Sequence, residues 1–279
     1  MIFSPKRTLV IVACTTLVGC SNPGLPATML DTPDQPLRLY TTQAALPLVT
    51  DLTDAYSELM TDMELRSGSL RTALNALHSG EVPYIISSHL PPPEPNRPPL
   101  WAAPIAQDGL ALIVNTANRI QNVSLDEVRD LYQGRVKNWQ SLGGSNLDVV
   151  LFSPEQGADT RAEFEHLVMG PSRPITLSAR LANSSDSALK FVSATEGGIA
   201  YIPLSALSTG YRADNIRVLQ IDNISATSFN VAQNRYPLRS TIFIIGLQEP
   251  QGRLRAFFGW IQSPDGQVIV RQNYTPLSY

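Results

Sequence analysis

Hydrophobic residues recur along the chain in strand-like and helix-like segments that alternate. Residues 37–41 have strand character, and Leu48, Leu52 and Tyr56 then recur at helical spacing. The predicted strands cover residues 37–41, 63–66, 82–87, 110–114, 147–152, 199–202 and 241–245, and the predicted helices cover 48–59, 70–77, 125–132, 160–169, 187–194 and 254–261. Over residues 37–87, strands that alternate with helices favour a helix-covered, parallel sheet, and six prolines between residues 91 and 99 then break the alternation.

Two helix starts carry a capping box, in which a hydroxyl residue is followed three positions later by glutamate. Ser124 and Glu127 form the first pair, and Thr160 and Glu163 form the second. In such a box the hydroxyl accepts a backbone N–H, and the glutamate reaches back to the N–H of the capping residue. Both pairs therefore predict where a helix begins.

Three strand-to-helix turns are rich in hydroxyl residues and glycine. They are Thr41-Thr42-Gln43, Ser67-Gly68-Ser69 and Gly157-Ala158-Asp159-Thr160. The first turn of a helix has unpaired backbone N–H groups, which together with hydroxyls can hold an anion without a full counter-charge. Each turn taken alone is also explained as a helix cap. Three such turns in one chain favour an anion site.

The N-terminus has the pattern of a bacterial lipoprotein signal. Lys6 and Arg7 precede an apolar run from Thr8 to Gly19, which is too short to span a bilayer core of about 30 Å. The run ends in Leu17-Val18-Gly19-Cys20, which looks like a lipobox in which Cys20 receives lipid. An ordinary signal peptide with a chance cysteine is the alternative.

These features predict an extracytoplasmic protein anchored to the cell membrane through Cys20. Residues 1–19 would be removed as a signal peptide, and residues 20–36, which are rich in proline, would form a tether. Cleavage would also remove Cys14, so the mature chain would have no free thiol for a disulfide, a metal site or a nucleophile.

Charge and motifs exclude several functions. The net charge is −3 and only 16% of the residues are charged, which argues against nucleic-acid binding. His78, His89 and His166 are far apart without ligand spacing, so we predict surface or capping roles and no metal site. The chain has no nucleophile elbow and no P-loop, so we expect no enzyme and no cofactor, with a hydrolase as the enzyme alternative.

The chain resembles the solute-binding proteins of phosphate-type ABC importers, the periplasmic phosphate-binding-like family. Four stretches carry the resemblance, which together with the N-terminal turns covers nearly the whole predicted mature chain. They are residues 105–144 with Ala106-Gln107-Asp108-Gly109-Leu110, the turn Gly157-Ala158-Asp159-Thr160-Arg161, Gly197-Gly198-Ile199-Ala200-Tyr201-Ile202-Pro203, and residues 257–277 with Tyr274-Thr275-Pro276-Leu277.

The resemblance implies a two-lobed α/β fold of the type II periplasmic-binding-protein kind, with mixed sheets covered by helices and two crossing hinge strands. Residues 37–110 and 238–279 would form the first lobe, and residues 111–237 the second. A ligand would lie in the cleft between the lobes. The ligand-binding residues expected there are Thr41, Thr42, Gln43, Ser69, His89, Gly157, Ala158, Asp159, Thr160 and Arg161.

Several positions depart from the phosphate-binding pattern of that family. Ala158 stands in place of a serine, Asp159 in place of a glycine, and Pro154 near the position of an arginine. His89 stands where the family has the acid that accepts the proton of phosphate. Two donors are lost and a negative charge is added, which argues against phosphate itself. Because no acid remains at His89 to disfavour a fully ionised anion, we expect weak discrimination between phosphate and sulfate.

The resulting expectation is a monomeric, lipid-anchored solute-binding protein of an ABC importer. It would bind a small phosphate-like oxyanion in the cleft and deliver it to the permease subunits. The alternative is a degenerate binding protein that acts as a surface interaction or sensor subunit without transport. The altered ligand turns favour the alternative, whereas the intact lobe-and-hinge pattern favours solute binding.

Overall fold

The computed structural model describes residues 36–57, 63–171, 173–208 and 214–277. The predicted signal peptide, the lipidated Cys20 and nearly all of the predicted tether lie outside these residues. Within the described part of the chain, none of the helices combines the length and apolar character needed to cross a membrane.

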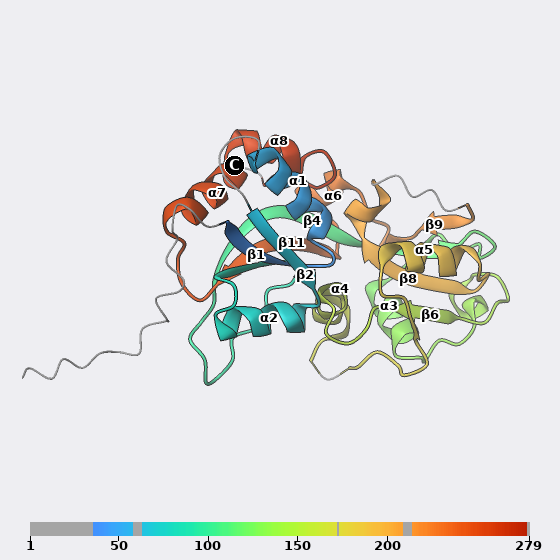
Figure 1. Ribbon diagram of the computed structural model, residues 1–279. Coiled ribbons are helices and arrows are strands. Elements are labelled where there is room, and N and C mark those ends of the chain that lie inside the picture. Colours follow the sequence, from blue (N-terminus) through green and yellow to red (C-terminus); the bar gives the residue numbers. More distant parts are fainter. Residues whose placement is uncertain (1–35, 58–62, 172, 209–213, 278–279) are drawn as a thin grey trace, which may run out of the picture. The chain divides into compact units, whose positions relative to one another are not determined.

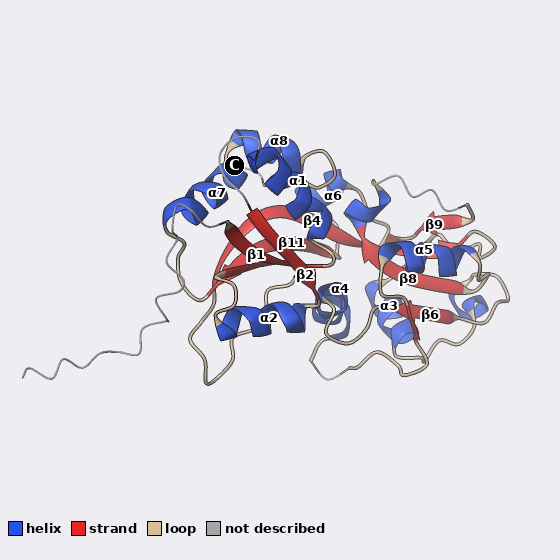
Figure 2. Cartoon of the chain, in the orientation of Figure 1, coloured by secondary structure: helices blue, strands red, loops and turns tan. Residues whose placement is uncertain are grey.

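Nine strands of the described residues form one mixed sheet (Figures 1 and 2). The strand order is β2 (Met63–Gly68), β1 (Leu37–Thr42), β3 (Tyr84–Ser87), β11 (Arg239–Gly246), β4 (Trp101–Asn115), β8 (Gly198–Pro203), β6 (Val150–Ser153) and β7 (Arg180–Leu181), with β9 (Ile216–Val218) also paired to β4. Strand β1 runs parallel to β2 and β3, but β11 runs antiparallel to β3 and β4. The parallel sheet predicted over residues 37–87 is therefore confirmed, and the antiparallel β11 makes the whole sheet mixed, as the predicted fold class requires. A two-stranded sheet joins β10 (Gln220–Ile221) to β5 (Asn122–Val123).

Helices cover both faces of this sheet. The α-helices are α1 (Leu46–Ser57), α2 (Leu70–Ser79), α3 (Leu125–Tyr132), α4 (Asp159–Phe164), α5 (Ser185–Ser193), α6 (Ser228–Ala232), α7 (Gly252–Gln262) and α8 (Pro264–Val270). Three short helical segments of other types are η2 (Trp139–Leu142), η3 (Glu165–Met169) and η4 (Leu204–Leu207). Because η3 follows α4 without a break, the two form one continuous helical stretch that ends at Gly170.

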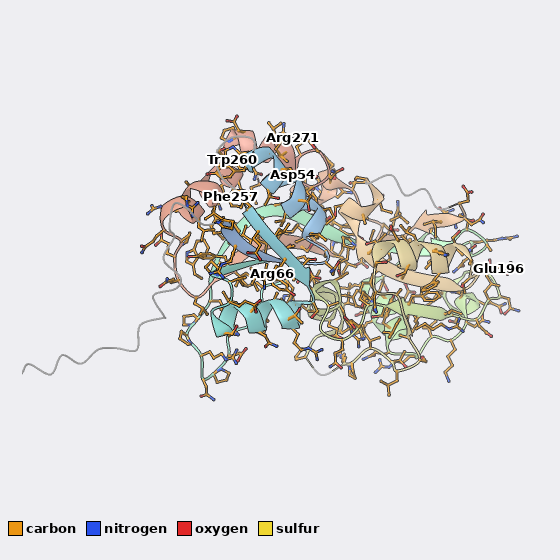
Figure 3. The ribbon with its side chains drawn as sticks, viewed as in Figure 1. Asp54, Arg66, Glu196, Phe257, Trp260 and Arg271 are labelled. Carbon is orange, nitrogen blue, oxygen red and sulfur yellow. The ribbon has the colours of Figure 1, made fainter. Side chains whose placement is uncertain are left out.

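The first part of the sheet, from β2 to β11, has a hydrophobic core on each face. Figure 1 shows α1, α7 and α8 on one side of β1 and β11, and α2 on the other. Ile244 packs with the first group and Ile245 with α2, as alternating side chains of a strand require. Phe257 and Trp260 of α7, labelled in Figure 3, pack against the ring of Tyr56.

The second part of the sheet is built in the same way around the C-terminal half of β4. Leu110, Leu112 and Val114 face the core beneath α3 and α4, whereas Ala111 and Ile113 face α5. These five residues are buried, which explains why they form an unbroken apolar run in the sequence.

Strand β4 joins the two parts of the sheet. Residues between Trp101 and Gly109 pair with β11, and residues from Leu110 to Val114 pair with β8. The change of partner follows Gly109, the residue after Asp108, whose side chain is buried. This crossing strand and the two sets of cores agree with the predicted two-lobed fold class. The residue boundaries of the lobes stay a prediction.

Candidate functional site

The turns that follow β1 and β2 lie side by side. Thr42 pairs with Gly68 in the parallel ladder, and the backbone N–H of Gln43 donates to the Gly68 carbonyl at 3.2 Å. Ser69 then caps α2, because its hydroxyl accepts the N–H of Thr72 at 3.2 Å. The sequence predicted a turn from Ser67, but β2 continues through Gly68. The two parallel strands end at the same edge, and this places both turns together.

The third predicted turn lies against the start of α2. The carbonyl of Gly157 accepts the backbone N–H of Arg71 at 3.4 Å. Ala158 occupies the capping position of α4 without a side-chain hydrogen bond, and Asp159 is the first helical residue. The structure therefore brings the three hydroxyl-rich turns of the sequence to one place.

A cavity of about 400 Å³ opens beside these turns. Five of the ten predicted site residues line it, and they are Gln43, Ser69, Ala158, Asp159 and Thr160. Its other side is formed by residues of the second part of the sheet and by the start of α5, including Asn183, Ser184, Ser185 and Tyr201. The hydroxyl of Ser184 caps α5 by accepting the N–H of Ser187 at 3.1 Å.

Asp159 is a buried acidic residue at the cavity. Its residue is 1% exposed, and its Oδ2 accepts two hydrogen bonds, from the Thr42 hydroxyl at 2.5 Å and from the Ser88 hydroxyl at 2.8 Å. Asp159 therefore turns toward the site and does not act as a helix cap. Thr42 is the last residue of β1, and Ser88 directly follows β3. These bonds therefore connect α4 to the ends of two neighbouring strands.

A second polar pair lies one helical turn further along α4. Nδ1 of His89 is 2.7 Å from Oε2 of Glu163, and both side chains are about nine-tenths buried. The predicted capping box of Thr160 and Glu163 is therefore wrong, because α4 begins at Asp159 and the Glu163 carboxylate binds a distant partner. Residues four apart share one face of a helix, so Asp159 and Glu163 contact the consecutive residues Ser88 and His89.

The histidines are arranged differently from the prediction. The ring centroids of His89 and His166 lie 5.8 Å apart, although the sequence separation suggested that they were remote. His89 is 8% exposed and is therefore a buried residue and not a surface one. Within the described residues, no group of three histidine, cysteine, aspartate or glutamate side chains could hold a metal ion.

The remaining predicted residues are used in contacts within the protein. The Thr41 hydroxyl lies 3.3 Å from the carbonyl of Thr42 and 3.5 Å from that of Ile86. The Arg161 guanidinium donates to Glu165 at 2.9 Å and to the carbonyl of Pro154 at 3.2 Å. Arg161 is not among the residues that line the cavity. Its guanidinium forms an ion pair with the Glu165 carboxylate.

Tyr201 forms part of the cavity wall and is held rigidly. Its ring stacks on Phe164 with centroids 3.9 Å apart, and its hydroxyl lies 2.6 Å from that of Ser153. Burial raises the pKa of the Tyr201 phenol well above its usual value, so the hydroxyl is neutral. It can donate or accept a hydrogen bond without adding charge.

Sequence reasoning missed Ser88, Glu163 and the cap of α5 as parts of this region. Ser88 follows a strand without any turn motif, so nothing in its neighbourhood marks it. The spacing of Asp159 and Glu163 was an available signal, since two acids one turn apart on a half-buried helix need partners in the fold.

Comparisons with known proteins place the chain in a family. The phosphate-binding protein PstS of Bacillus subtilis (strain 168) is 27% identical over 176 residues, which are 62% of this chain and 57% of that protein. The chain thus spans about six-tenths of the length of this curated relative. A putative phosphate ABC transporter substrate-binding protein from Clostridium perfringens, solved with bound phosphate, has a TM-score of 0.77 at 22% identity and covers 88% of this chain and 100% of its own.

A second solved structure shows the same fold. An ABC-type phosphate transport receptor from Vibrio cholerae has a TM-score of 0.74 at 18% identity, over 86% of this chain and 100% of that chain. The family model described as a PBP superfamily domain matches residues 27–265. This match confirms the resemblance on which the two-lobed α/β fold was predicted, and the chain belongs to the PBP superfamily.

Proposed function

We propose that this chain is the solute-binding protein of an ABC importer and that it binds a small phosphate-like oxyanion. The observation that carries the proposal is the pair of hydroxyls of Thr42 and Ser88, which meet on one anionic oxygen at 2.5 and 2.8 Å. Neutral hydroxyls that converge on a negatively charged oxygen are a donor set for an oxyanion. The relatives that are named as phosphate-binding proteins support the same class of ligand.

An anion in the cavity would have to be held by neutral donors. Among the described residues that line it, Glu155 and Asp159 are acidic, and no lysine, arginine or histidine is present. The caps of α2 and α5, Ser69 and Ser184, both line it. The N–H groups that the caps of these helix starts leave unpaired, together with hydroxyls, would carry the binding in place of a counter-charge.

The finer features of the proposal come from the sequence. We propose that Cys20 carries the lipid anchor, that the domain lies on the extracytoplasmic side of the cell membrane, and that a monomer delivers its ligand to the permease subunits. The proposed lobes are residues 37–110 with 238–279, and residues 111–237, so that the cavity would lie where they meet.

A second candidate function is a surface interaction or sensor subunit without transport. One observation favours it: the chain's own carboxylates already use the donors of the site. Thr42 and Ser88 bind Asp159, and His89 binds Glu163. A protein that has lost its solute could retain the arrangement of these side chains through such internal contacts.

Thermal unfolding of the full-length chain in detergent, with phosphate, sulfate and other oxyanions up to high millimolar concentration, separates the two candidates. A ligand at 100 times its dissociation constant adds about 2.7 kcal/mol to the free energy of unfolding, so a saturable rise in Tm is expected for at least one oxyanion. A cooperative transition that no oxyanion shifts would contradict the first candidate and favour the second.

A further inference from the structure

The hydroxyls of Thr42 and Ser88 have no proton left for an external ligand. Each hydroxyl carries a single proton, and each donates it to Oδ2 of Asp159. A phosphate or sulfate that approached these groups would meet two oxygens whose donors are already used. It would also meet the negative charge of the carboxylate at close range, which is repulsive in a partly buried site.

The carboxylate is held in this position by the rest of α4. Glu163, one turn further along the helix, binds His89 at 2.7 Å, so the face of α4 that carries Asp159 is attached to the segment after β3 at two points. Within the described part of the chain, Asp159 takes part in no ion pair with a lysine, arginine or histidine. Its hydrogen bonds to Thr42 and Ser88 are therefore the interactions that stabilise its buried charge.

We propose that the Asp159 carboxylate is a built-in anion that occupies the oxyanion position of this site and determines its specificity. An external oxyanion reaches Thr42 and Ser88 only by displacing Asp159, so the wild-type site binds phosphate and sulfate weakly. Removal of the carboxylate converts the same site into one that binds free oxyanions well. This inference rests on the proposed function, because it assigns the Thr42 and Ser88 pair to oxyanion binding.

Calorimetric titration of inorganic phosphate and sulfate into the full-length chain tests the proposal. Asp159→Ala removes the carboxylate, and Asp159→Asn keeps its volume but removes its charge. We expect Asp159→Ala to bind phosphate at least about tenfold tighter than the wild type, because two donors return and a like charge leaves. We expect Asp159→Asn to improve binding less, because the amide still fills the position. Asp265→Ala removes an exposed charge from the first turn of α8, a helix with no residue among those that line the cavity, and serves as the control, with binding unchanged from the wild type.

Equal affinity of the wild type and Asp159→Ala for phosphate would overturn the proposal. If neither protein binds phosphate or sulfate, the proposed oxyanion function fails, and a double-mutant cycle decides the placement of Asp159. The cycle combines Thr42→Val with Asp159→Ala and reads the unfolding equilibrium constant. A coupling of at least about fivefold supports the contact, and additive effects overturn it. Thr41→Val with Asp159→Ala is the control cycle, because the buried Thr41 hydroxyl bonds to carbonyl groups only.

Discussion

Asp108 is a buried carboxylate at the point where β4 changes partners. Its Oδ1 accepts the N–H groups of Gly109 and Ser205 at 2.8 and 3.1 Å, and its Oδ2 accepts the Ser205 hydroxyl at 2.6 Å. Burial raises the pKa of Asp108 from 3.8 to about 6, and these hydrogen bonds offset part of the shift. The folded protein therefore favours the protonated form of Asp108 more than the unfolded chain does. Titration of Asp108 affects the free energy of unfolding in the mildly acidic range.

The sign of this effect follows from the raised pKa. The stability linked to Asp108 is fully present below the unfolded pKa of 3.8 and is lost as the pH rises through about 6. Asp108→Asn keeps both accepting bonds and can donate to Ser205, so at neutral pH it should raise the free energy of unfolding by up to about 3 kcal/mol. Urea unfolding between acid and neutral pH measures this. Parallel stability curves for the two proteins would contradict the assignment.

Glu163 and His89 form a buried pair that tolerates little change. Glu163→Ala leaves the imidazole without its partner and should lower the free energy of unfolding by about 3 kcal/mol. Glu163→Gln keeps an accepting oxygen and should cost only about 1 kcal/mol. Urea unfolding at one pH compares the two variants. A similar small loss for both would mean that the hydrogen bond contributes little.

The residues of the site could be predicted only where the local sequence marks them. The turns at Thr42, Ser69 and Asp159 stand out because hydroxyls, glycine and a helix start occur together. Glu163 was misassigned because its spacing from Thr160 fits a capping box equally well, and its partner is distant in sequence. A local pattern does not distinguish a capping role from a tertiary hydrogen bond.

At the scale of elements, local signals predicted the helices better than the full extent of the strands. The capping box of Ser124 and Glu127 is confirmed, with both reciprocal hydrogen bonds present at the start of α3. Strand β4 begins at Trp101, well before the predicted start at residue 110. The prediction began late because Pro104, Gln107 and Asp108 interrupt the apolar pattern. Helix α8 was not predicted, since its start at Pro264 has the composition of a turn.

The cap of α3 gives a direct test of this local control. Ser124→Ala removes the side-chain acceptor for the N–H of Glu127 and should lower the free energy of unfolding by about 1 kcal/mol. Ser124→Thr retains a capping hydroxyl and should cost much less. Denaturant midpoints at constant m-value compare the variants. An equal loss for alanine and threonine would show that the hydroxyl is not the stabilising group.

At the scale of the whole molecule, the crossing strand explains how one chain builds two sets of cores. Residues of β4 belong to the core beside α1 and α7 before Asp108 and to the cores beside α3 and α5 after it. Family resemblance predicted this arrangement, whereas the alternation of strands and helices indicated only the parallel pairing of the first three strands. The long antiparallel pairing of β4 with β11 joins residues far apart in sequence, which local patterns do not reveal.

Cys20, the predicted site of the lipid anchor, lies outside the described residues. Because lipid chains supply the membrane affinity in this account, Cys20→Ala should move the protein from the membrane fraction to the soluble fraction without a change in its Tm. Fractionation of cells followed by immunoblotting measures the change. A wild-type protein that is already soluble and carries no lipid would contradict the predicted lipobox.

The central claim is that Thr42 and Ser88 form an oxyanion site that Asp159 fills. A crystal structure of Asp159→Ala grown with phosphate tests it most directly. The account predicts a phosphate whose oxygens lie within hydrogen-bond distance of both hydroxyls, at the position that the carboxylate holds in the wild type. A phosphate bound only in the cavity, away from both hydroxyls, or no phosphate with the Thr42 hydroxyl turned to the carbonyl of Ile86, would contradict the claim.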